Sequence, residues 1–153
     1  MTQAAYLGKK KIAEIMLENF AYLDLNLPTI DSGYTALSAA CMAGHYDIVV
    51  LLVENGADVN QLDCMDQSPL IYCFARLNED ENYYENKQLA IRMADVLLRH
   101  GADINQYSHG KTILMNFCRK YSNMKEVQQR CLIGVIKYLL LNGADAFKTE
   151  QFG

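Results

Sequence analysis

The chain has 153 residues, of which 51% are hydrophobic, and its formal net charge is −4. This length suits one domain or one short repeat array with a sizeable buried core. The mild negative charge argues against a dedicated nucleic-acid-binding protein, which usually carries a basic excess. No apolar run approaches the roughly 20 residues that span a bilayer, so membrane insertion is not expected.

The cysteine pattern and the chain start indicate a reducing compartment. The sequence contains five cysteines, an odd number, and no two of them form a C-x-x-C pair. Residues 1–6 lack the charged-then-apolar order of a signal peptide. Reduced thiols in the cytoplasm are therefore expected, or in the cytosol of a host cell if the protein is a secreted effector.

Along the chain, the first helical pattern is formed by Ile12, Ile15 and Met16, which predict a helix over residues 12–20. A pair of alanines at residues 4–5 and Gly8 precede it, so residues 1–29 are interpreted as a partial helix–turn–helix repeat. The lysine and glutamate side chains of this segment are expected to give a polar outer face that caps a stack.

Two short elements then recur. Residues 56–61 read G-A-D-V-N-Q, residues 101–106 read G-A-D-I-N-Q, and residues 143–145 read G-A-D. Upstream of each lies a second element: T-A-L at 35–37, S-P-L 33 residues later, and T-I-L at 112–114. The glycine of each G-A-D element accepts the left-handed conformation that ends a helix. A period near 33 residues is typical of one class of helical repeat.

The segment 30–62 resembles the ankyrin repeat family closely. It reads G-Y-T-A-L, A-C, G-H, I-V-V-L-L and G-A-D-V-N in order, against the family pattern G-x-T-P-L-H, A-A, G-H, I-V-x-L-L and G-A-D-V-N. It departs at Ala36, usually proline, and at Ser38, usually histidine. The resemblance covers nearly the whole chain and implies an all-α solenoid of stacked helix-turn-helix units with short hairpin loops.

This resemblance divides the chain into about four repeats within one ankyrin-repeat domain over residues 1–153: 1–29 (partial), 30–62, 63–106 and 107–149. The last two are longer than the period by about 12 and about 10 residues. Both insertions are predicted between the first and second helix, at residues 78–86 and around 121–125. The acidic and aromatic run 79–85 is either a solvated loop or a loop that contacts a partner, since tyrosine is enriched at binding hot spots.

The last predicted helix is nearly all apolar over residues 135–141. A terminal repeat needs a polar outer face, so this helix is expected to cap poorly and to expose Ile136, Leu140 and Leu141. Self-association through this C-terminal layer is therefore a candidate property.

No catalytic motif is present: the sequence has no Gly-rich phosphate loop, no H-E-x-x-H and no G-x-S-x-G. No cofactor or metal site is expected. The family resemblance implies a structural hydrogen bond for His45. His100 precedes a helix stop, where a solvated cation is favoured by the helix dipole. For His109, at a predicted hairpin tip, structural and functional roles both stay open.

The cysteines define a rival of a different class, an enzyme with an atypical cysteine site. Cys41, Cys73 and Cys118 fall on the small-residue positions of the first helices, which favours burial as small hydrophobes. Cys64 lies in a predicted hairpin and is expected to be exposed, but it lacks the paired histidine of an activated nucleophile.

The favoured function is protein–protein interaction. In the ankyrin family the usual binding site is the concave face, formed by hairpin tips and the inner side of the first helices. This face is predicted to run from apolar to basic, so it suits a partner with an apolar knob and an acidic patch. Mapping by repeat position gives the candidate partner-binding residues: Tyr34, Met42, Met65, Gln67, Tyr72, Arg76, His109, Lys111, Arg119 and Lys120.

Within this set, Tyr34, Met65, Tyr72 and Arg76 are expected to carry most of the binding energy, and the last three basic residues to act as rim charges. Two biological settings fit the interpretation. One is an ankyrin segment of a larger scaffold or secreted effector, and the other is a small stand-alone inhibitor, such as a toxin-neutralising (immunity-type) protein.

Overall fold

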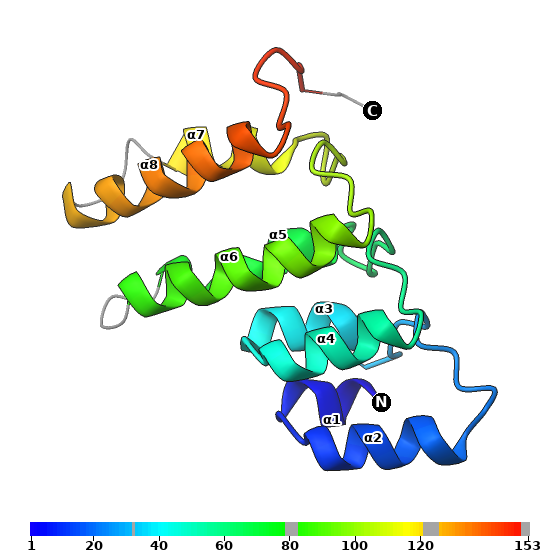
Figure 1. Cartoon of the computed structure of the whole chain (residues 1–153). Coiled ribbons are helices and arrows are strands. Elements are labelled where there is room, and N and C mark those ends of the chain that lie inside the picture. The colour runs from blue at the N-terminus through cyan, green and yellow to red at the C-terminus, as the bar shows by residue number, and fades with distance from the viewer. Residues whose placement is uncertain (32, 79–82, 121–125, 151–153) are drawn as a thin grey trace.

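The computed structural model describes residues 1–31, 33–78, 83–120 and 126–150. Within these ranges, the side chains of residues 78, 83, 120, 126–128 and 131 lie outside the described set. Helix pairs stack in chain order from the N-terminus to the C-terminus, joined by hairpin loops along one edge (Figure 1). The pairs are α1 (Thr2–Tyr6) with α2 (Lys10–Asn19), α3 (Ala36–Ala43) with α4 (Tyr46–Glu54), α5 (Pro69–Cys73) and the 3-10 helix η1 (Ala75–Asn78) with α6 (Tyr83–Arg99), and α7 (Ile113–Lys120) with α8 (Glu126–Leu141).

This arrangement confirms the predicted all-α solenoid. The described residues contain no β-strand, only an isolated bridge between Ser108 and Lys111 in a hairpin. The described helices include none long and apolar enough to cross a membrane. The core lies between the two helix layers and between neighbouring pairs. It includes the predicted Leu52 and Leu97, both fully buried.

Local side chains set the ends of α3. The Ser38 backbone N–H donates to the Thr35 hydroxyl oxygen at 3.1 Å, and that hydroxyl donates to Ser38 Oγ at 3.0 Å. Thr35 thus caps the helix start, and Ser38 keeps a local hydrogen bond where the repeat pattern usually has histidine. Gly44 ends the helix with a φ of 77°, a left-handed conformation that glycine adopts without strain.

Asparagines link each hairpin to the next repeat, which explains why the G-A-D-V-N element recurs. The Asn60 side chain accepts from the Asp103 backbone N–H at 2.7 Å and donates to the Gly101 carbonyl at 2.9 Å. Asn105 makes the same two contacts with Asp145 and Gly143, at 2.7 and 2.9 Å. The side chain therefore satisfies backbone groups at the end of the next second helix.

The prediction that residues 79–85 form a loop is wrong for 83–85. The second helices of the two repeats with insertions are long: α6 has 17 residues and α8 has 16, whereas α4 has 9. Residues 83–86 form the first turn of α6, because continuing the helix adds one hydrogen bond per residue. Tyr84 is 65% exposed, with the Lys87 ammonium 5.2 Å from its ring centre. The rest of the first insertion, 79–82, and the region 121–125 lie outside the described residues.

Both ends of the stack expose apolar side chains. As predicted, Leu140 and Leu141 of α8 are exposed, at 44% and 87%, whereas Ile136 is half-buried against the core. The expected polar cap at the other end is incomplete, because Ile12 and Ile15 of α2 are 50% and 46% exposed. The lysines and glutamates of α2 therefore share its outer face with apolar residues.

The predicted burial of Cys118 is also wrong, since this side chain is exposed. Its repeat position is that of Cys41 and Phe74, which are buried against the following first helix. No following helix of the described chain covers α7, so the same position faces outward there. The other predicted core cysteines, Cys41 and Cys73, are buried, and the side chain of Cys131 lies outside the described set.

Candidate functional site

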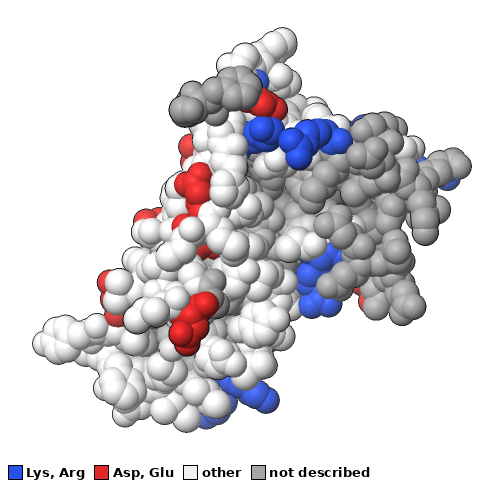
Figure 2. Space-filling model, turned by 180° about the vertical axis from the view of Figure 1, so that it is seen from behind, with Lys and Arg blue, Asp and Glu red and all other residues white. Residues whose placement is uncertain are grey.

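The first helices α1, α3, α5 and α7 form the face seen from behind in Figure 2. Acidic side chains gather along the hairpin edge of this face, and Lys and Arg form separate patches on it. Much of the remaining described surface in this view is uncharged. Two hollows open on this face, one between α5 and α7 and one between α1 and α3.

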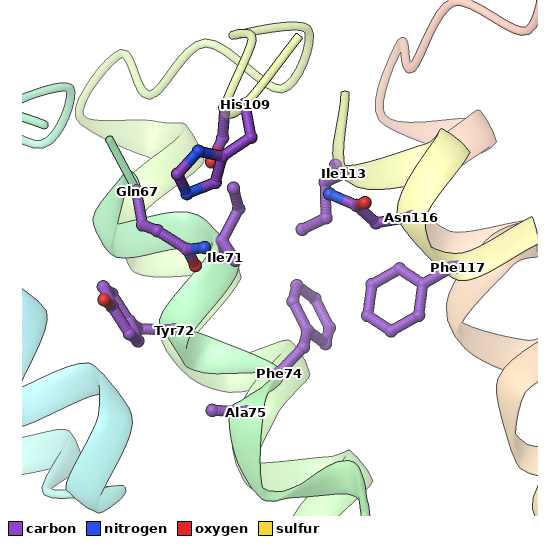
Figure 3. Close-up of a pocket in the computed structure, with 10 residues that line it drawn as sticks. Gln67, Ile71, Tyr72, Phe74, Ala75, His109, Ile113, Asn116 and Phe117 are labelled. Carbon is purple, nitrogen blue, oxygen red and sulfur yellow. The ribbon is translucent and has the colours of Figure 1, made fainter. Parts of the chain in front are cut away.

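The hollow between α5 and α7, of about 350 Å³, has an apolar floor under a polar rim (Figure 3). Its volume lies at the low end of the range typical of ligand pockets, roughly 300–1,000 Å³. The helices α5 and α7 supply the floor. The hairpin that contains Ser108 and His109, together with Gln67 in the hairpin before α5, supplies most of the rim. The lining residues are Gln67, Ile71, Tyr72, Phe74, Ala75, Ser108, His109, Ile113, Asn116 and Phe117.

Two phenylalanines keep α5 and α7 apart. The rings of Phe74 and Phe117 pack edge to face with their centres 5.5 Å apart. At the corresponding contact between α3 and α5, the neighbouring side chains are the much smaller Cys41 and Cys73, and the backbones of these two helices lie close together. The hollow therefore exists because bulky residues occupy repeat positions that are small in the previous layer.

Three polar side chains point into this hollow in Figure 3: Gln67, His109 and Asn116. In the described part of the chain, none of these side chains has a hydrogen-bond partner. The backbone of His109 is fixed, since its N–H donates to the Asp66 carboxylate at 2.9 Å. The rim thus presents free amide and imidazole groups from two hairpins and from α7.

The second hollow, of about 330 Å³, lies between α1 and α3. Tyr34 and Met42, both predicted partner-binding residues, line it together with Thr2, Gln3 and Tyr6. The small side chains of α1 and α3 bring these helices close together, and the hollow lies on their outer surface.

A tyrosine pair separates the two hollows. The rings of Tyr34 and Tyr72 pack edge to face with centres 5.5 Å apart, and each ring lines one hollow. Tyr72 is only 7% exposed. Burial raises the pKa of its phenol well above the usual value, and the neighbouring Asp63 and Tyr34 raise it further, so Tyr72 stays neutral. Tyr72 is therefore part of the wall between the two hollows and does not project from the face.

Comparison with known proteins agrees with this architecture. A model of ankyrin repeats, described as three copies, matches residues 1–105. The chain belongs to the ankyrin repeat family. Ankyrin repeats are in general protein–protein interaction modules rather than enzymes.

Similar proteins come from animals and a virus. The human ankyrin repeat and SOCS box protein 6 is 30% identical over 154 positions, covering 100% of this chain and 33% of that protein. The mouse B-cell lymphoma 3 protein homolog is 30% identical over 115 positions, covering 74% and 21%. A mimivirus protein, putative ankyrin repeat protein L371, is 30% identical over 118 positions, covering 76% and 14%. The chain thus spans a third or less of each of these relatives.

Several predicted site residues of this ankyrin domain have structural contacts. The half-buried Arg76 donates from Nη1 to the Ala43 carbonyl at 2.9 Å and so caps the end of α3. Lys111 forms an ion pair with Glu150 at 3.0 Å. Met65, at 41%, is exposed on its hairpin, and Arg119 is exposed on α7. The side chain of Lys120 lies outside the described residues.

Mapping by ankyrin position thus found Gln67, Tyr72 and His109 of the larger hollow but not its floor. Ile71, Phe74, Ile113 and Phe117 were absent from the predicted site. The available signal was the pair of phenylalanines at the positions that Ala40 and Cys41 occupy in the second repeat.

His45, His100 and the buried cysteines have structural contacts. The imidazole Nε2 of His45 lies 3.0 Å from the Tyr6 carbonyl, which confirms the predicted structural hydrogen bond. His100 is exposed at the end of α6, with Nδ1 2.8 Å from the Val96 carbonyl. Burial raises the pKa of the Cys73 thiol, and the adjacent Cys41 raises it further, so the Cys73 thiol stays protonated. Among the described residues, no group of three or more candidate ligands could hold a metal ion.

Proposed function

We propose that this ankyrin domain binds one partner protein through its first-helix face, centred on the hollow between α5 and α7. The observation that carries the proposal is the convergence of Gln67, His109 and Asn116, without partners in the described chain, over an apolar floor. Unpaired polar groups beside accessible apolar surface are typical of binding sites.

Exposed residues around the hollow extend this surface. Met65 lies on the neighbouring hairpin and supplies flexible apolar contact area. Tyr34 and Met42 continue the face toward α1. At the other end, Lys111, which is ion-paired with Glu150, and Arg119 lie at the rim, where charges mainly raise the association rate of a partner with an acidic patch. The cytoplasm, or a host cytosol, is the proposed location.

The test starts from affinity capture of partners from the native cell, followed by measurement of the dissociation constant. A face variant carrying Met65→Ala and Asn116→Ala removes accessible side chains without touching the buried Tyr72 or Arg76. A control variant, Tyr84→Ala, changes the exposed start of α6 instead. The face variant is expected to weaken binding by at least about tenfold, which corresponds to about 1.4 kcal/mol. Loss of binding in the Tyr84 variant alone would refute the assignment.

Two further candidates have their own observations. Exposed Leu140, Leu141 and Ile133 on α8 favour self-association through the C-terminal layer, and sedimentation of the wild type and of Leu141→Lys would reveal it. A stand-alone inhibitor would use the same first-helix face, and it is recognised by loss of the partner's activity on binding. The cysteine-enzyme alternative predicts rapid labelling of the exposed Cys64 by a thiol probe at neutral pH, whereas an ordinary thiol reacts slowly.

A further inference from the structure

We propose that the hollow between α5 and α7 anchors one uncharged, apolar side chain of an extended segment of the partner, and that the rim holds the backbone of that segment. This proposal rests on the proposed function and specifies the chemistry of its central contact. Three features of the hollow support it: the apolar floor, the uncharged lining and the polar groups on the rim.

The floor selects for an apolar side chain. Ile71, Phe74, Ile113 and Phe117 expose carbon surface toward the hollow (Figure 3). An aromatic or branched aliphatic side chain placed there would lose contact with water on most sides, which stabilises the complex in proportion to the apolar area buried. The edges of the phenylalanine pair also offer favourable contacts to an aromatic guest.

The lining selects against charge. The ten described residues around the hollow include no Asp, Glu, Lys or Arg. The one acidic side group among them, the Tyr72 phenol, is kept protonated by burial. A charged side chain entering the hollow would lose its hydration with no Asp, Glu, Lys or Arg in the lining to pair with it, which is unfavourable. The anchoring residue is therefore uncharged.

The rim selects for an extended backbone. Gln67 and Asn116 carry amides that both donate and accept hydrogen bonds, as a peptide group does. Gln67 approaches from the hairpin before α5 and Asn116 from α7, on opposite sides of the hollow, and His109 approaches from the next hairpin (Figure 3). An extended segment offers backbone N–H and C=O groups to both sides. A helix uses those groups internally and could not satisfy the three side chains.

The test uses the whole chain with isoleucine δ1-methyl groups labelled with 13C for NMR. The probes are blocked pentapeptides of the form acetyl-Gly-Gly-X-Gly-Gly-amide, with X as Leu, Phe, Asp or Lys. We expect saturable shifts of the Ile71 and Ile113 methyl signals with Leu and Phe. We expect none with Asp and Lys. The methyl of Ile133, exposed on the distant α8, serves as the internal control and should not move.

Two variants connect the signal to this hollow. Ala75→Phe places a ring at the exposed mouth and is expected to abolish the shifts. Asn116→Leu keeps a similar shape but removes the amide, and should weaken peptide binding by about two- to tenfold, as for one lost hydrogen bond. Unchanged thermal midpoints would show that both variants fold.

The outcomes separate this inference from the proposed function. Equal shifts with charged and apolar peptides, or no shifts with any peptide, would overturn the anchor. If the captured partner binds Ala75→Phe normally but loses affinity for the Met65 and Asn116 face variant, the anchor is wrong and the face assignment stands. If both variants bind the partner with wild-type affinity, the face assignment itself fails.

Discussion

The contact between α3 and α5 and the contact between α5 and α7 join equivalent helices of successive repeats, yet only the second leaves the larger hollow. Small thiols meet in the first contact and two phenyl rings meet in the second. Side-chain size at these two positions of the repeat therefore sets the spacing of the first helices. A regular stack acquires a local opening without any change in its topology.

The largest expected effect comes from removing the ring that separates α5 from α7. Phe117→Ala deletes a side chain that is 7% exposed and packed on Phe74, so it should lower the free energy of unfolding by about 3–5 kcal/mol. Urea denaturation measures this loss. Phe117→Leu, which keeps most of the volume, should cost much less. An unchanged midpoint for the alanine variant would mean that the ring does not support the layer.

The second helices α4 and α6, which accompany the two contacts, are packed alike. Leu52 in α4 and Leu97 in α6 occupy the same repeat position and are both fully buried. Leu52→Ala and Leu97→Ala should each cost roughly 2–5 kcal/mol, because each leaves a cavity between layers. Similar losses in the free energy of unfolding, measured by urea denaturation, would show that the two contacts differ only in their first helices. A loss in only one variant would contradict that view.

Transplanting a ring into the close contact should have an intermediate effect. Cys73→Phe forces a phenyl group between α3 and α5, where Cys41 leaves no room, and should cost about 1–3 kcal/mol through overpacking. Cys73→Ala is the control for loss of the thiol. Equal stability of the phenylalanine and alanine variants would show that the α3–α5 spacing adjusts freely.

The smallest expected effect tests the hairpin edge, which is the same in both layers. Asn60→Ala removes one hydrogen bond to Asp103 and one to Gly101, and Asn105→Ala removes the equivalent pair. Each variant should lose about 1 kcal/mol, because these exposed bonds are replaced in part by water. The hydrogen-exchange rates of the Asp103 and Asp145 amides report on each bond directly. Continued protection of an amide in its variant would contradict the assignment.

Much of the fold was predictable because the repeat pattern is local. The Thr35 cap, the left-handed Gly44, Gly56, Gly101 and Gly143, and the apolar spacing of the second helices are each fixed by a few neighbouring residues. The positions of Gln67 and His109 on the first-helix face follow from the same register. Such features need only the period and the chemistry of helix ends.

Other features depended on which residues meet across layers. Insertion residues from Tyr83 onward joined α6 instead of a loop, and Asn86 reached the Arg76 carbonyl at 3.3 Å. Tyr72 and Arg76 turned inward to contacts with Tyr34 and Ala43, although repeat position alone placed them on the open face.

The repeat class and the order of the helices follow from the sequence alone. The tertiary structure is needed to show that α5 and α7 stand apart, that a hollow lies between them and that Cys118 faces outward. The physical reason is that helix ends and hairpins are stabilised by neighbours in the chain. Spacing between layers depends instead on side chains such as Phe74 and Phe117, which lie far apart in sequence and meet only when the repeats stack.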